Sequence, residues 1–323
     1  MTAEFDSELN QWIEMLRSPD LSDRLVAVKT LQHLGDEAAL EPLIMALADK
    51  SQAVQKLAVT ALWELANPAA VPALVKCLAS SDAEIRDEAR SALGELVSAE
   101  HLLLLLDALH QDDPNVQLNI LFLLRKIHDI QCLSYVLPFF KSANAQLREA
   151  AVTTLRYLNQ VASCHAAIAL MSDPDATVRR ATALTLGHLA DPEVIPTLCQ
   201  ALTADADWQV RRNAAKSLFI HADSTAVAVL ETALRDEHWQ VRKFALQALQ
   251  KTPDNCTLPA LVKALTDEYS DVRKEAAIAL GVLQNPAALN ALQQALDDPD
   301  KDVCIYTQRA IQQIQSMQET SHA

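Results

Sequence analysis

Residues 267–283, DEYSDVRKEAAIALGVL, decide the fold, because residues 173–189, DPDATVRRATALTLGHL, repeat their pattern. Each stretch has a valine before an arginine, a small residue four positions after the valine and a leucine eight positions after it. These three positions lie on one face of a helix with 3.6 residues per turn. The pattern predicts an amphipathic helix, and its recurrence predicts a repeat protein.

The valine position, called here the anchor, recurs every 31 residues, with one step of 32 at the loop 203–207. The anchors are Asp23, Val54, Ile85, Val116, Leu147, Val178, Val210, Val241, Val272 and Val303. Four positions later the residue is mostly alanine, and eight positions later it is leucine or isoleucine. A small residue at that place lets a neighbouring helix approach closely.

A second apolar pattern precedes each anchor and predicts another helix, and an aspartate-rich turn separates the two. The unit is therefore helix–turn–helix, and ten copies are expected at about residues 4–34, 38–65, 69–97, 99–127, 133–158, 161–189, 193–221, 224–251, 256–283 and 287–317. One copy cannot bury its apolar stripe alone, whereas stacked copies can. The prediction is an all-α superhelix that forms one solenoid domain over residues 1–323.

The pattern D-x-D-x-x-V-R-x-x-A-x-x-A-L-G-x-L resembles the HEAT-like repeats of the phycobilisome lyase type. The resemblance covers nearly the whole chain and implies a HEAT-repeat solenoid whose second helices line the concave side. It also implies a protein-binding groove. The pattern is specific for the repeat and says little about any one activity.

Composition limits the function classes. The formal net charge of −15 opposes general binding to nucleic acid or to an anionic membrane. No apolar run approaches the length of a membrane span, and no signal peptide is recognisable at the N-terminus. The six cysteines form no CxxC pair or zinc-ligand spacing and suit a reducing cytoplasm. We expect Cys77, Cys256 and Cys304 to lie in the core.

Repeat 5 departs from the pattern. Pro138 falls inside its first helix, where a proline removes one backbone hydrogen bond and shortens or kinks the helix. Residues 159–167 also fit the template poorly. A change of superhelical curvature is expected around residues 128–168.

Two rows of side chains are candidate surfaces. The residue after the anchor is arginine in seven copies, and pairing with the turn aspartates predicts a structural ladder. The next position is basic in four successive copies, at Arg180, Arg212, Lys243 and Lys274. Trp208, His238, Trp239 and Tyr269 stand just before the anchors of the same region. We interpret these eight residues as a basic and aromatic ridge at the starts of adjacent second helices, suited to an acidic peptide, carboxylates or propionates. Packing tryptophans beside solvated cations are the alternative.

Catalysis has little support, because no Ser-His-Asp order, phosphate loop or HExxH motif is present and the nine histidines do not cluster at ligand spacing. No metal site and no cofactor are predicted. The main hypothesis is a non-enzymatic, cytoplasmic scaffold that binds a protein partner in its groove. The resemblance suggests, as its specific form, the cyanobacterial HEAT-repeat partner of an A-type iron–sulfur scaffold protein, with an interface iron–sulfur cluster as a possible cofactor. The alternative is an E/F-type phycobilin lyase that handles a linear tetrapyrrole such as phycocyanobilin.

Overall fold

The computed structural model describes residues 2–158 and 161–322, and within these ranges every regular element is a helix. The first helices of the repeats are α1 (Thr2–Met15), α3 (Leu40–Ala46), α5 (Val71–Cys77), α7 (Leu102–Ala108), α9 (Leu133–Val136), α11 (His165–Ala169), α13 (Val194–Ala204), α15 (Val227–Ala233), α17 (Leu258–Ala264) and α19 (Leu289–Gln294). The second helices are α2 (Leu21–Leu34), α4 (Gln52–Leu65), α6 (Ala83–Leu96), α8 (Pro114–Ile127), α10 (Ala145–Leu155), α12 (Ala176–Leu186), α14 (Trp208–His221), α16 (Trp239–Leu249), α18 (Ser270–Leu283) and α20 (Lys301–His322).

Short 3-10 turns precede or extend most first helices, at Glu37–Ala39, Pro68–Ala70, Ala99–His101, Ile130–Cys132, Leu137–Lys141, Leu170–Ser172, Ser224–Ala226, Asn255–Thr257, Pro286–Ala288 and Ala295–Asp297. The chain forms two compact units, residues 1–160 and 161–323, called unit 1 and unit 2. The expectation of one continuous solenoid domain stays a prediction.

The core consists of the predicted helix face. From Val54 to Val303 all nine later anchors are buried, and so are all ten leucine or isoleucine side chains eight positions after the anchors. The first anchor differs, because Asp23 is half-exposed and accepts a hydrogen bond from the Ser18 hydroxyl at 2.7 Å. The alanines four positions after the anchors have no exposed surface, which is why neighbouring second helices pack closely.

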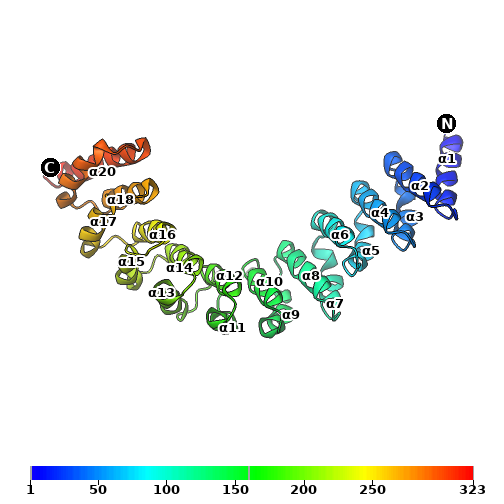
Figure 1. Ribbon diagram of the computed structural model, residues 1–323, viewed down its shortest axis with the longest axis horizontal. Helices are drawn as coiled ribbons and strands as arrows, with labels where there is room; N and C mark the ends of the chain where they lie inside the picture. Colours follow the sequence, from blue (N-terminus) through cyan, green and yellow to red (C-terminus); the bar gives the residue numbers. More distant parts are fainter. Residues whose placement is uncertain (1, 159–160, 323) are drawn as a thin grey trace. The chain divides into compact units, whose positions relative to one another are not determined.

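Within each unit the second helices lie side by side in one row and the first helices in another (Figure 1). Neighbouring second helices pack against each other more extensively than neighbouring first helices do. A stack whose layers lie closer on one side bends toward that side. The second helices therefore line the inner side of the curve in each unit, which agrees with the expectation that they line the concave side.

The turn aspartates start the second helices. Asp20, Asp82, Asp113, Asp175 and Asp207 are N-caps whose carboxylates accept backbone N–H groups of the first helical turn. Several second helices end in a left-handed residue, which is Gly35 in the first copy but Ala66, His128, Ala222 and Gln284 in later copies. The later copies thus carry a Cβ where glycine has none.

The irregular copies lie where the sequence placed them. Helix α9 has only four residues before the chain tightens into a 3-10 helix that begins with Leu137 and Pro138, so the expected shortening is confirmed. Helix α11 has five residues, in agreement with the poor template match before it. Asn159 and Gln160, inside that poorly matching stretch, lie outside the described residues. The expected change of curvature stays a prediction.

The longest helix among the described residues is α20, and neither it nor any other described helix combines the length and apolar character that a bilayer span needs.

Candidate functional site: the aromatic and basic ridge of unit 2

The arginine after the anchor forms the predicted structural ladder. Nε and Nη2 of each of five arginines donate to both carboxylate oxygens of the next copy's aspartate, at 2.6–3.1 Å, in the pairs Arg24–Asp49, Arg179–Asp205, Arg211–Asp236, Arg242–Asp267 and Arg273–Asp298. The Nη1 group of each arginine donates to carbonyls of its own turn, as Arg242 does to Asp236 at 2.8 Å. Each pair thus joins two consecutive copies.

The ladder also affects ionisation, and it is absent from several copies of unit 1, where Gln55 and Gln117 stand in place of the arginine. The guanidinium of Arg273 holds the pKa of Asp298 below its ordinary value. Arg86 donates to the Ser80 and Ser81 carbonyls, and Gln111 stands where the next copy would supply an aspartate. The ladder prediction is therefore confirmed in five copies, and these arginines are not free to bind a partner.

The four aromatic residues of the ridge form one stack. The rings of Trp208 and His238 are nearly parallel, with centroids 3.6 Å apart. The centroids of His238 and Trp239 are 6.5 Å apart, and those of Trp239 and Tyr269 are 5.3 Å apart, with interplanar angles of 16° and 15°. Trp208 belongs to α14, Trp239 begins α16 and Tyr269 caps α18, so the aromatic stack bridges three successive second helices.

The aromatic stack occupies positions that normally cap helices. His238 and Tyr269 are the N-cap residues of α16 and α18, where most other copies have aspartate or asparagine. His238 accepts the Gln240 N–H through Nδ1 at 3.4 Å, and the Tyr269 side chain accepts no capping hydrogen bond. A good N-cap contributes about 1 kcal/mol to stability. Tyr269 is 41% exposed, so burial does not compensate for the lost cap.

The basic members of the ridge, called the cation row, are only partly neutralised. Arg180 forms a bidentate pair with Asp207. Lys243 and Lys274 share the single carboxylate of Asp271, at 3.2 and 3.3 Å. Burial alone would raise the pKa of Asp271, but hydrogen bonds from the two lysines lower it.

Arg212 differs from the other cations of the row, because no carboxylate pairs with it among the described residues. Its guanidinium donates to the amide oxygens of Asn213 and Gln240, at 3.0 and 3.3 Å, and lies 5.3 Å from the ring centre of Trp208. Burial, with repulsion from Arg180, lowers the pKa of Arg212. A half-buried cation with only neutral partners attracts an anion more strongly than a paired cation does.

Each unit has further cation–aromatic pairs that the sequence did not single out. In unit 2, Lys216 lies 5.1 Å from the ring centre of Phe244, and Lys251 lies 5.0 Å from that of Phe219. In unit 1, Arg90 and Arg125 both lie over Phe122, at 5.5 and 5.6 Å. Phe122 stands six positions after its anchor, so comparing the residues at this position in successive repeats would have found it.

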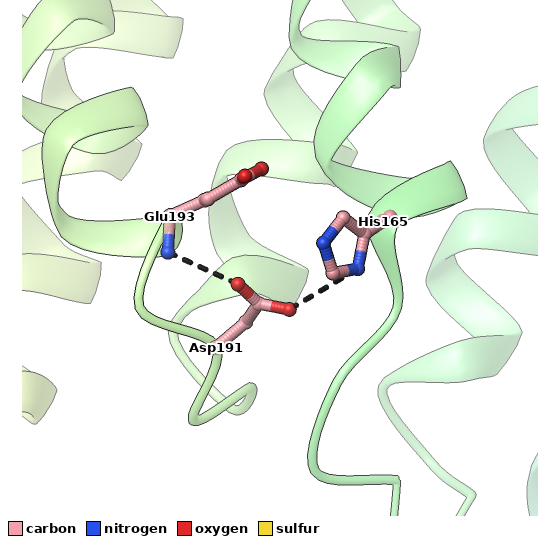
Figure 2. Close-up of side chains that lie close together, drawn as sticks. All are labelled: His165, Asp191 and Glu193. Atoms are coloured by element: carbon pink, nitrogen blue, oxygen red, sulfur yellow. Dashed lines mark hydrogen bonds and ion pairs between the residues drawn. The ribbon is translucent and has the colours of Figure 1, made fainter.

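A second cluster lies at the beginning of unit 2 and was missed by the sequence. Ligand atoms of His165, Asp191 and Glu193 lie within 4.8 Å of one another. Figure 2 shows His165 at the start of α11 beside Asp191 and Glu193, which precede α13. The three residues lie 26 and two positions apart, so no local motif marks them.

The cysteines have separate environments. Cys132 and Cys164 are buried, Cys77 and Cys304 are half-buried, and Cys256 is exposed, which corrects the expected core placement of Cys256. That residue sits in a surface 3-10 turn after its cap, Asp254, whose carboxylate raises the pKa of the Cys256 thiol. Cys304 donates to the Asp298 carbonyl at 3.1 Å, and burial raises the pKa of Cys77 to about 11.

Repeated helical pairs, the aspartate turns and the arginine ladder define the class of protein, and the comparisons agree. The HEAT repeats family model matches residues 9–94, 165–250 and 227–312, more than half of the chain. The protein therefore belongs to the HEAT-repeat family. No curated protein gives a match.

Solved structures show the same fold. An engineered protein has 22% identity and a TM-score of 0.54, with 95% of this chain and 98% of that chain covered. Yeast importin-beta (Kap95p) has 15% identity and a TM-score of 0.63, and the match covers 96% of this chain and 52% of that one. Escherichia coli YibA has 20% identity and a TM-score of 0.52, with 93% and 98% covered. A HEAT-repeat solenoid is consistent with a protein-binding scaffold.

Proposed function

We propose that this protein is a non-catalytic scaffold that binds an acidic, extended segment of a partner protein along the aromatic stack and cation row of unit 2. The observation that carries the proposal is Arg212, a half-buried cation with neutral partners beside Trp208. Arg180, Lys243 and Lys274 form ion pairs with only two carboxylates, Asp207 and Asp271, and Arg212 forms none among the described residues. A negatively charged side chain of a partner would balance this excess.

Two further observations support a peptide. The ridge follows the starts of four successive second helices, which at roughly 10 Å per helix corresponds to about 30 Å. An extended chain covers that length with about nine or ten residues. His238 and Tyr269 stand where aspartate would cap the helices better, so the aromatic rings are retained at a cost in helix stability.

The test is fluorescence anisotropy with a labelled peptide of alternating glutamate and serine, about twelve residues long, and a lysine–serine peptide of equal length as the charge control. We expect the wild type to bind the acidic peptide at low salt and to lose affinity as salt screens the charges. Replacing Trp208 and Trp239 together by alanine should reduce affinity by roughly tenfold, about 1.4 kcal/mol. Trp63→Ala, a half-buried tryptophan of unit 1, is the matched control.

Two outcomes would refute the proposal. One is that the wild type binds the lysine–serine peptide as tightly as the acidic peptide, because charge complementarity would then not explain binding. The other is a double variant whose loss of affinity is matched by an equal loss of unfolding free energy, because the tryptophans would then serve packing alone.

Two finer versions follow from the resemblance of the repeat. In the first, the partner is an A-type iron–sulfur scaffold protein. In the second, the ridge handles a linear tetrapyrrole, and the proximity of Arg212 and Lys243 to the indole rings supports it, since cations would pair with propionates. One indole face is already covered in each tryptophan by a neighbouring ring, which favours the peptide.

A pull-down from a cyanobacterial extract, with absorbance spectra of the eluate, separates the two versions. A visible bilin band or phycobiliprotein subunits would support the tetrapyrrole. A small iron–sulfur scaffold protein without bilin colour would support the first version.

A further inference from the structure

We propose that His165, Asp191 and Glu193 form a binding site for a divalent transition metal that joins repeat 6 to repeat 7 within unit 2. Figure 2 shows the three side chains facing a common space. The Nδ1 atom of His165 lies 3.4 Å from Oδ2 of Asp191. His165 belongs to α11 and the two carboxylates to the turn just before α13, so a bound ion would link successive first helices.

Asp191 is the fixed part of the site. Its Oδ1 accepts the Glu193 N–H at 3.0 Å, and its Oδ2 accepts the Ser163 hydroxyl. These two hydrogen bonds hold the carboxylate in one orientation. Each oxygen has two lone pairs and retains acceptor capacity for a metal ion.

The burial of Asp191 sets it apart from the equivalent residues of other copies. Asp36, Asn67, Ser98, Asp129, Asp223, Asp254 and Asn285 also precede a first helix, and all are half-exposed or exposed. Asp191 is only 5% exposed. The cause is the non-helical segment 161–164, which runs beside the turn and is tied to it by the Ala190 N–H and the Ala162 carbonyl at 2.7 Å.

This buried carboxylate has no strong cationic partner. Among residues 2–158 and 161–322, its one ion pair is with His165, whose charge depends on protonation. The cluster brings two carboxylates together, and no lysine or arginine pairs with either of them among the described residues. A divalent cation would balance them, and the exposed His165 and Glu193 side chains can rotate toward it.

The donor set selects the class of ion. One imidazole nitrogen and two carboxylate oxygens suit Zn²⁺ and Co²⁺, because imidazole is a poor ligand for Ca²⁺ and Mg²⁺. Three protein ligands leave positions for water. The Ser163 hydrogen bond orients the Asp191 carboxylate in the way that outer partners orient ligands in metal sites.

The test is calorimetric titration of the full chain with Zn²⁺ after chelation, together with the absorption spectrum of the Co²⁺ form. We expect one equivalent of Zn²⁺ whose affinity falls by roughly tenfold or more in His165→Ala and in Glu193→Gln. Both side chains are exposed, so folding should be preserved. His33→Ala, an exposed histidine of unit 1, is the matched control and should bind as the wild type does.

Two further measurements keep the result specific. The Co²⁺ spectrum should lack thiolate charge-transfer absorption, which would instead indicate a cysteine site. Zn²⁺ should raise the unfolding midpoint of the wild type and not that of His165→Ala. Equal Zn²⁺ affinity in wild type and His165→Ala, or no binding to the wild type, would overturn the proposal.

Discussion

Substitutions of the neighbouring residues Arg211 and Arg212 should have different effects, although both residues are arginines. A change at Arg211 should lower stability, and a change at Arg212 should weaken peptide binding. Arg211 belongs to the arginine ladder and donates two hydrogen bonds to Asp236. Arg212 belongs to the cation row and has only neutral partners. We would replace each by glutamine separately, which removes the charge and leaves a shorter, neutral polar side chain.

The expected magnitudes follow from the contacts. Arg211→Gln leaves the Asp236 carboxylate, 10% exposed, with one backbone donor, the His238 N–H at 2.8 Å. Breaking a fully buried ion pair costs about 3–5 kcal/mol, and partial exposure lowers this to about 2–4 kcal/mol. For a unit of this size the midpoint of thermal unfolding should fall by roughly 5–10 °C.

Arg212→Gln should change stability by less than about 1 kcal/mol. The contact with the Trp208 ring is lost, at a cost of about 0.5–1 kcal/mol. Relief of desolvation and of the repulsion from Arg180, which lower the pKa of Arg212, offsets part of that loss.

The assays are urea unfolding followed by circular dichroism and anisotropy with the glutamate–serine peptide. Arg212→Gln should lose affinity for the peptide by roughly tenfold and keep its unfolding midpoint, whereas Arg211→Gln should show the reverse. If Arg212→Gln loses as much unfolding free energy as Arg211→Gln, then Arg212 is a structural residue and the reasoning about its unpaired charge is wrong.

Further predictions concern stability. The pKa of Asp298 is lowered in the fold. Its contribution to the free energy of unfolding is therefore present above the ordinary pKa of about 3.9 and is lost as the pH falls through the lower folded value. Urea midpoints measured from about pH 5 downward should fall less steeply in Asp298→Asn than in the wild type. Ala222→Gly should raise the unfolding free energy by about 0.5–1 kcal/mol, because Ala222 has φ of +51°; a decrease would contradict the strain argument. Gly281→Ala should cost roughly 1–3 kcal/mol, since its Cβ would lie 3.1 Å from the backbone of α20, whereas Gly94→Ala, with open space, should gain about 0.5–1 kcal/mol.

The sequence predicted the fold in detail because every copy buries the same face of its second helix against its neighbours. The anchor, the small residue and the following leucine share one helix face, so their spacing alone identifies the buried surface. The ladder was predictable for a related reason. An arginine and an aspartate, such as Arg211 and Asp236, occupy the same two repeat positions in several copies. Stacking of consecutive copies brings the arginine of one copy beside the aspartate of the next.

The sequence predicted which residues form the candidate site, but it did not predict the contacts between their side chains. Alignment of the copies placed Trp208, Trp239 and the basic residues in rows. It did not give the insertion of His238 beside Trp208, or the sharing of Asp271 by two lysines, because ring planes and side-chain torsions depend on neighbours in three dimensions. Asp191 was missed for another reason: its burial comes from a non-helical segment that departs from the repeat.

The N-cap residues of two second helices differ from those that helix capping prefers, and both of these residues belong to the ridge. The helices α16 and α18 would start better with aspartate, yet they start with His238 and Tyr269, which stack against tryptophans of the ridge. Among the earlier second helices, from α2 to α14, all except α4 start with an aspartate or asparagine whose side chain accepts a backbone N–H. Natural sequences depart from such rules mainly where another requirement outweighs stability. A packing role alone would favour burial of the rings, whereas Tyr269 is exposed, so recognition of a partner accounts better for their retention.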